Sequence, residues 1–272
     1  MTLQASLPAR LSCEIDLISI CGPVREENQD AGVAWRGAGG EVVLIVADGM
    51  GGHDAGRVAA ETTVRACLES IRNRTRESWQ EVLESAIGAA HASVLATVRA
   101  GEERRRPGAT VALAVITARA EHPSLHVAHV GDSRVYLYRG RSLYRLTTDH
   151  SLVARMVHDG LLREEEAWGH PDSNVIQRAI GQAGPLQPEV QAPVELDAGD
   201  VVLLCSDGLH GALPDPEIAA ALGPGGSAHE ICARLLAAAL AAGSQDNVTI
   251  GCARLAGETR RRPTRVQRGA RS

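Results

Sequence analysis

Five aspartates carry the clearest chemical signal in this sequence, because each stands at the end of a predicted strand or in a turn, beside a small residue. They are Asp30, Asp48, Asp132, Asp207 and Asp246. For any one of them, turn formation or helix capping is an ordinary role. Strand-terminal acids of one domain can also converge at one end of a sheet, where their mutual repulsion requires cations. Taken together, the acids predict a site for hard, oxygen-preferring ions such as Mg²⁺ or Mn²⁺.

The segment 41–55 (EVVLIVADGMGGHDA) shows the pattern most fully. Its apolar run, 42–47, is rich in β-branched residues and too short for a typical helix, so it predicts a strand buried on both faces. The run ends in Asp48, and Gly49 and the glycines after it allow backbone groups to approach a ligand closely. Asp-Gly after a strand is also a common turn signal, so a plain turn is the alternative.

Gathered carboxylates of this kind suit hydrolysis. Two divalent ions about 3.5–4 Å apart form a hydrolytic site and lower the pKa of a shared water. Arg25 stands five residues before Asp30, and its planar guanidinium can hold a phosphate through two hydrogen bonds. The residues therefore predict metal-assisted hydrolysis of a phosphoester.

Composition excludes several other phosphate-handling proteins. The 28 basic residues are all Arg, and a Walker A loop, a Schiff-base enzyme and a protein kinase each need a lysine. The six Cys form no CxxC pair and no Cys-x5-Arg motif, which disfavours a thiol-based phosphatase. They are predicted to be reduced core residues of a cytoplasmic protein.

The charge is distributed unevenly. Residues 257–272 hold six Arg and one Glu, a charge of +5, so the other 256 residues carry −10 of the total of −5. An acidic body fits a cation site and argues against nucleic-acid binding. The Arg-rich tail predicts disorder, either simply solvated or as a docking arm for an acidic partner. The chain shows no signal peptide and no membrane-spanning apolar run, so no membrane association is expected.

Strands and helices are predicted in blocks rather than in alternation. The strands cover 13–21, 31–35, 42–47, 110–117, 125–130, 134–138, 142–146, 201–205 and 248–254, and the helices 57–72, 78–98, 215–222 and 228–242. Ser78 and Glu81 predict a capping box, and Arg139-Gly140 a hairpin turn. The charged segment 150–170 predicts a mobile excursion over the surface. Blocks of this kind favour antiparallel sheets with flanking helices over a parallel sheet.

The acidic segments, in order, resemble the motifs of metal-dependent PP2C-type (PPM) serine/threonine phosphatases, most closely the stand-alone bacterial type. The five segments are 22–30 (GPVREENQD), 48–53 (DGMGGH), 131–134 (GDSR), 206–209 (SDGL) and 245–249 (QDNVT). Segments 148–150 (TDH) and 174–181 (NVIQRAIG) also resemble that family. The resemblance extends from about residue 13 to residue 254.

The resemblance implies an α+β fold, a four-layer αββα sandwich in which two central antiparallel β-sheets are flanked by helices. It implies a phosphatase domain at 13–255, preceded by an N-terminal extension at 1–12 and followed by the Arg-rich tail at 256–272. The segment 152–172 would form a flap beside the site. We expect the flap to influence substrate choice, and an unrelated mobile loop is the alternative.

The resemblance also assigns metal ligands. Asp48 would bridge two Mn²⁺ or Mg²⁺ ions, and the Gly49 carbonyl would bind one of them. Asp207 and Asp246 would hold the other ion. Asp30 would act through metal-bound water. Asp132, with Asp207, would hold a third and weaker ion.

Three residues receive catalytic roles: Arg25 and Asp48, implied by the resemblance, and His53, a candidate. Arg25 would bind the substrate phosphate. His53 is a candidate general acid, although a surface histidine after a glycine loop is also ordinary. The expected reaction is hydrolysis of phosphoserine and phosphothreonine in proteins by metal-activated water, without a phosphoenzyme.

The expected partners are phosphorylated proteins and a cognate Ser/Thr kinase that this phosphatase opposes, with the chain acting as a monomer. Two alternatives come from other classes. One is a catalytically silent binding module that keeps the fold. The other is a phosphoesterase that acts on small phosphoesters such as nucleotides.

Overall fold

The computed structural model describes residues 12–51, 54–75, 78–98, 107–117 and 123–257. His53, the Arg-rich tail from residue 258 and residues 1–11 of the predicted N-terminal extension lie outside the described residues. Of the charged segment 101–107, which its flanking Gly and Pro predict to be a surface loop, the structure describes only residue 107. The domain boundaries at residues 12 and 255 stay predictions.

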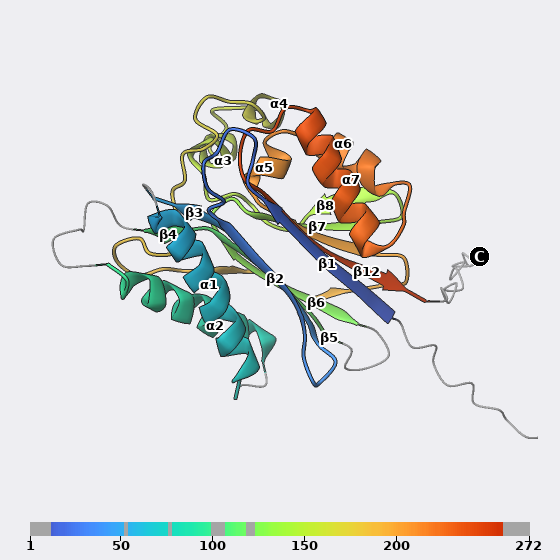
Figure 1. Cartoon of the computed structure of the whole chain (residues 1–272), viewed down its shortest axis with the longest axis horizontal. Coiled ribbons are helices and arrows are strands. Elements are labelled where there is room, and N and C mark those ends of the chain that lie inside the picture. Colours follow the sequence, from blue (N-terminus) through green and yellow to red (C-terminus); the bar gives the residue numbers. More distant parts are fainter. Residues whose placement is uncertain (1–11, 52–53, 76–77, 99–106, 118–122, 258–272) are drawn as a thin grey trace, which may run out of the picture.

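Two antiparallel sheets pack face to face at the centre of the molecule (Figure 1). The first has the strand order β10-β6-β5-β3-β2, with β4 paired to β3 and β9 paired to β6. Its strands are β2 (Asp30–Arg36), β3 (Val42–Met50), β4 (Gly108–Ala109), β5 (Val111–Thr117), β6 (Ser124–Val130), β9 (Glu189–Val190) and β10 (Val194–Glu195).

The second sheet has the order β1-β12-β11-β7-β8. Its strands are β1 (Ser12–Ile20), β7 (Arg134–Arg139), β8 (Ser142–Arg145), β11 (Val201–Cys205) and β12 (Val248–Ala256). The order joins the first and last strands of the chain, because β1 pairs with β12 from Ser12↔Ala256 to Ile20↔Val248.

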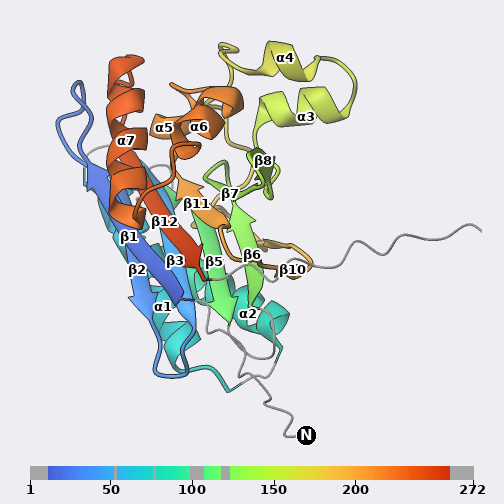
Figure 2. The ribbon, with the colours of Figure 1, turned by 90° about the vertical axis from the view of Figure 1, so that its right-hand side faces the viewer.

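Helices cover both outer faces of the paired sheets (Figures 1 and 2). The first sheet is covered by α1 (Ala55–Arg72) and α2 (Trp79–Leu95), and the second by α5 (Asp207–His210), α6 (Asp215–Leu222) and α7 (Ala228–Ala241). The short helices α3 (Leu152–His158) and α4 (Glu164–Ala167) lie in the predicted flap. The four layers confirm the predicted αββα sandwich.

Strand β3 shows why its sequence is apolar without interruption. Val43, Ile45 and Ala47 pack against α1 and α2, whereas the alternate residues Val42, Leu44 and Val46 pack against the second sheet. Alternate side chains of a strand face opposite sides, so a strand between two layers needs apolar residues at every position. Truncating a side chain such as Leu44 to Ala should cost about 2–5 kcal/mol.

Two local predictions were wrong. Ser78 precedes α2 in an extended conformation, but its side chain makes no capping hydrogen bond. The β7–β8 turn is Gly140-Arg141, because Arg139 pairs with Ser142 and both turn residues have positive φ, 57° and 70°, as a type I′ turn requires. Asp207, which follows β11, is the first residue of α5.

Among the described residues, no helix has both the length and the apolar character needed to cross a membrane.

Candidate active site

Four of the five predicted aspartates line one cavity of about 980 Å³. Its lining includes Arg25, Gln29, Asp48, Gly49, Thr110, Asp132, Asn174, Asp207, Asp246 and Asn247. The fifth, Asp30, lies behind the cavity wall, directly opposite Asp48 in the β2–β3 pairing. Its carboxylate is buried and accepts a hydrogen bond of 2.6 Å from Ser206 Oγ. The acids that are distant in the sequence therefore meet at one place.

Both sheets contribute to this cavity. Asp48 comes from β3 of the first sheet. Asp207 follows β11 and Asp246 precedes β12, both strands of the second sheet. Asp132 lies in the turn from β6 to β7, where the chain passes from one sheet to the other. The cavity is thus formed across the junction of the two sheets.

Glycines allow the loops around the cavity to touch. A Cβ atom at Gly22 would lie 1.9 Å from Asp246 O, and one at Gly208 would lie 2.0 Å from Asn247 O. At Gly49 a Cβ atom would lie 2.1 Å from the carbonyl oxygen of Gly56. These distances are too short for any side chain. Glycine is therefore required after Asp48 and Asp207 for steric reasons, in addition to the freedom that it gives the backbone.

Arg25 lies at the mouth of the cavity and is held there by contacts with the far end of the chain. Its Nη2 donates to Asp246 Oδ2 at 2.5 Å. Asn247 anchors the same loop, since its Oδ1 accepts from Gln29 N at 2.8 Å and its Nδ2 donates to Glu27 O at 3.0 Å. A predicted phosphate-binding residue is therefore paired with a predicted metal ligand.

Four of the five predicted aspartates, Asp30, Asp48, Asp132 and Asp207, have raised pKa values. Burial, followed by the charge of Asp246, raises the pKa of Asp207 to about 6. Burial raises the pKa of Asp30 to about 7 although the hydrogen bond from Ser206 opposes it, and the charge of Asp207 adds a smaller contribution. Burial and the charge of Asp207 also raise the pKa values of Asp48 and Asp132 well above their usual range.

These residues fit divalent cations. Asp207 Oδ1 is buried without a hydrogen-bond partner among the described residues, which is costly for a carboxylate oxygen unless a cation contacts it. The donors are oxygens, which hard ions such as Mg²⁺ and Mn²⁺ prefer. The predicted aspartates other than Asp246 have no ion-pair partner among the described residues, so their charges repel one another. A bound cation would relieve this repulsion and would also contact the unpartnered oxygen of Asp207.

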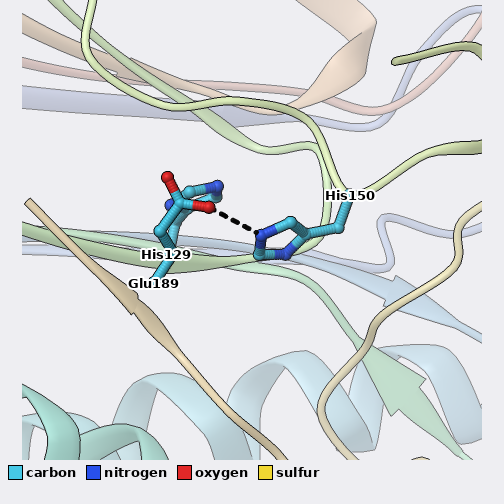
Figure 3. Close-up of side chains that lie close together, drawn as sticks. All are labelled: His129, His150 and Glu189. Carbon is cyan, nitrogen blue, oxygen red and sulfur yellow. Dashed lines mark hydrogen bonds and ion pairs between the residues drawn. The ribbon is translucent and has the colours of Figure 1, made fainter. Parts of the chain in front are cut away.

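A second cluster of possible ligands, His129, His150 and Glu189, lies outside this cavity (Figure 3). The two imidazoles stack with centroids 4.5 Å apart and planes at 18°. Lone pairs of imidazole lie in the ring plane, so nearly parallel rings do not point at one common ion. His150 Nδ1 instead accepts from Gly131 N at 3.1 Å. The cluster anchors the turn that carries Asp132.

Several supporting residues were missed at the sequence level. Asn247 holds the Arg25 loop, and Thr110 Oγ1 accepts a hydrogen bond of 2.9 Å from Asp48 N. Ser133 Oγ contacts the same Thr110 hydroxyl at 2.6 Å. A signal was present for two of these residues, because Asn247 and Ser133 each follow a predicted acid directly.

The model of the Protein phosphatase 2C family matches residues 24–249. This chain belongs to the protein phosphatase 2C family. It is 33% identical over 233 residues to the serine/threonine phosphatase stp of Listeria welshimeri, covering 84% of this chain and 90% of that protein. The predicted family is confirmed.

Solved structures of protein phosphatase 2C relatives share the fold. The serine/threonine phosphatase of S. agalactiae superimposes with a TM-score of 0.80 at 31% identity, covering 89% of this chain and 99% of that one. The catalytic domain of the serine threonine protein phosphatase PstP, solved in complex with two manganese ions, has a TM-score of 0.76 at 31% identity, covering 91% of this chain and all of the other.

Proposed function

We propose that this member of the protein phosphatase 2C family hydrolyses phosphoserine and phosphothreonine in proteins and depends on Mn²⁺ or Mg²⁺. The observation that carries the proposal is the meeting of Asp48, Asp207 and Asp246 at one cavity, with Arg25 at its mouth. The relatives named serine/threonine phosphatases support the substrate class.

The cavity residues would hold the ions as the family resemblance implies. Asp48, Asp207, Asp246 and the Gly49 carbonyl would hold two of them. Asp132 would help to hold a third, and Asp30 would act through water. When bound, the ions supply Lewis acidity and a water of lowered pKa.

The chain's own residues bind and orient the phosphate. Arg25 would exchange Asp246 for the substrate phosphate, since a guanidinium binds either anion with charge-assisted hydrogen bonds. Asn247 would keep the Arg25 loop in place during this exchange, because it bonds the backbone at Gln29 and Glu27. His53 remains a proposed general acid that lies outside the described residues.

The proposal extends to the cellular role. The chain would act as a monomer in the cytoplasm and oppose a cognate Ser/Thr kinase. Its ligands would be phosphoproteins rather than nucleic acids, since the charge outside the tail is −10, the total of −5 less the +5 of residues 257–272.

Turnover across a series of divalent metals tests the proposal. Peptides with phosphoserine, phosphothreonine and phosphotyrosine, a nucleotide and p-nitrophenyl phosphate are compared with Mn²⁺, Mg²⁺, Ca²⁺ or EDTA. We expect hydrolysis of the first two peptides with Mn²⁺ or Mg²⁺ and none with EDTA. Tight phosphopeptide binding without turnover would indicate a silent binding module, and preference for the nucleotide would indicate a small-molecule phosphoesterase.

A further inference from the structure

A second cavity of about 650 Å³ adjoins the acidic one. The two share Val24, Arg25, Asp207 and Asp246 in their linings. From there the second cavity continues to Trp168, just after α4, and to the segments that follow α5 and α7. We call it the Trp168 groove; its remaining lining consists of Gly208, Gly211, Ala212, Ala242, Gly243, Ser244 and Gln245.

Beyond the shared end, the described lining of the Trp168 groove has no charged side chain. Several of its backbone amides are already bonded within the chain; for example, Gly211 N donates to Asp207 O at 2.7 Å and Ser244 N to Ala239 O at 3.0 Å. Ser244 Oγ donates to Gly208 O at 2.7 Å. A charged ligand group placed there would lose its hydration without gaining an ionic partner, so the groove suits an uncharged occupant.

Trp168 gives the groove an apolar surface. The side chain is 52% exposed, and its single donor, Nε1–H, is used in a bond of 3.2 Å to His210 O. His210 is the last residue of α5, the helix that begins with Asp207. The indole is thus fixed beside the acidic cavity, with apolar surface open to solvent.

Val24 adds to this surface, because it is 65% exposed and lines both cavities. Exposed apolar side chains that gather beside a polar cavity mark a ligand-contact surface more than scattered ones do. Aromatic rings of tryptophan contribute large contact area at low conformational cost.

We infer that the Trp168 groove binds the part of the protein substrate next to the phosphorylated residue and selects a large apolar side chain there. The inference rests on the proposed function. Because Arg25 lines both cavities, a peptide whose phosphate contacts Arg25 brings its neighbouring residues to the groove. The groove is uncharged beyond that point, so it favours leucine over aspartate or arginine.

Peptide preference tests the inference. Two series of phosphothreonine peptides carry Leu, Ala, Asp or Arg at the positions just before or just after the phosphothreonine. Each kcat/KM is divided by the same variant's value for p-nitrophenyl phosphate, which reports folding and metal loading. For the wild-type chain we expect the normalised kcat/KM of the Leu peptide in one series to exceed that of its Ala counterpart by about tenfold. This is the effect of a few methylenes in an open apolar site.

Two variants distinguish the contribution of the apolar ring of Trp168 to the Leu preference from that of its hydrogen bond. Trp168→Ala should reduce the Leu preference to within about twofold, whereas Trp168→Phe, which keeps an apolar ring and loses the donor, should retain most of it. Tyr144→Ala is the matched control, because Tyr144 is also 52% exposed and lines neither cavity. Its Leu preference should equal that of the wild-type chain.

Three outcomes would each overturn the inference. The Leu preference could survive in Trp168→Ala, or Trp168→Phe could lose as much of the preference as Trp168→Ala does. The third is that the wild-type chain hydrolyses all the peptides equally well. These outcomes differ from failure of the proposed function, in which the wild-type chain with Mn²⁺ hydrolyses none of the phosphopeptides.

Discussion

Two groups of largely buried aspartates differ in their partners. Asp149 forms an ion pair with Arg134 at 2.6 Å, and Asp200 one with Arg139 at 2.5 Å. Burial alone would raise the pKa of Asp149, but the charge of Arg134 and the hydrogen bonds from it, with smaller contributions from His210 and Arg145, together outweigh burial, so the pKa is lowered. In the cavity, burial raises the pKa of Asp132, and the charges of other acids raise it further.

The partner of each carboxylate, rather than the residue type or its burial, determines the role of the aspartate. Asp149 is neutralised within the chain and fixes the end of β7, where Arg134 also donates to Tyr136 Oη at 3.0 Å. Asp207 keeps a buried oxygen without a partner among the described residues. The first aspartate is neutralised by an arginine of the fold, whereas the second is a ligand of an external cation in the proposed function.

The largest expected difference between the groups is in activity. Asp207→Ala should lower turnover of p-nitrophenyl phosphate with Mn²⁺ by more than about a hundredfold, since even the outer partners of metal ligands contribute 10–100-fold. Circular dichroism checks that the variant is folded. Asp197→Ala is the control, because that carboxylate is 59% exposed and outside the cavity. Full activity of Asp207→Ala would end the metal-site interpretation.

The free energy of unfolding should show the opposite order, with the larger loss on replacing the ion-paired Asp149 and little or no loss on replacing Asp207 of the cavity. Asp149→Ala leaves the guanidinium of Arg134 buried with its hydrogen bond to Tyr136 Oη and a weaker ion pair to Asp215 at 3.6 Å, and breaking a buried pair costs about 3–5 kcal/mol. Asp207→Ala removes a repelling charge and should leave the stability of the metal-free protein unchanged or higher. Urea denaturation of both variants in EDTA measures the difference, and the reverse order would contradict the comparison.

Arg25→Ala tests an arginine that belongs to the cavity rather than to the fold. Loss of charge-assisted hydrogen bonds should lower kcat/KM for a phosphopeptide about tenfold to a hundredfold. Both members of the Arg25–Asp246 pair are exposed, at 55% and 35%, so the free energy of unfolding should change by less than about 1 kcal/mol. A titration with Mn²⁺ should show affinity that is no weaker. Unchanged kinetics would remove Arg25 from the site.

The smallest effect is expected in the pH dependence of the metal-free protein. The pKa values of Asp30, about 7, and Asp207, about 6, lie above the ordinary value of 3.8. Between pH 4 and pH 7 the native state therefore binds more protons than the unfolded state, so stability falls as pH rises. We expect the melting temperature in EDTA to fall by a few degrees across this window and to rise instead with saturating Mn²⁺. Parallel profiles under both conditions would contradict the prediction.

The fold and the convergence of the acids could be predicted from the sequence, because both depend on repeated patterns. Uninterrupted apolar runs such as 42–47 mark strands between two layers, and five Asp residues in similar contexts are stronger evidence than one. Local rules failed where packing decides. Asp48-Gly49 and Asp207-Gly208 look alike in the sequence, yet the first lies in β3 and the second begins α5.

Contacts between distant segments were beyond prediction. Arg25 and Asp246 are 221 residues apart, and each had been assigned to a different ligand. Trp168 is bonded to the backbone of His210, a contact for which the charged sequence around it gives no signal. Such pairs follow from how the two sheets meet, which no window of neighbouring residues contains.

The position of the cavity at the junction of the sheets has a mechanical consequence. Leu44 and Val46 of one sheet and Leu204 of the other pack in the layer between them, so the thickness of this aliphatic layer sets the separation between Asp48 and Asp207. Enlarging or trimming those side chains should retune the preference among cations of different radius without altering any ligand. Bound ions would in turn hold the two sheets together at the open edge of the sandwich. The same carboxylates that destabilise the metal-free protein would therefore stabilise the metal-bound one.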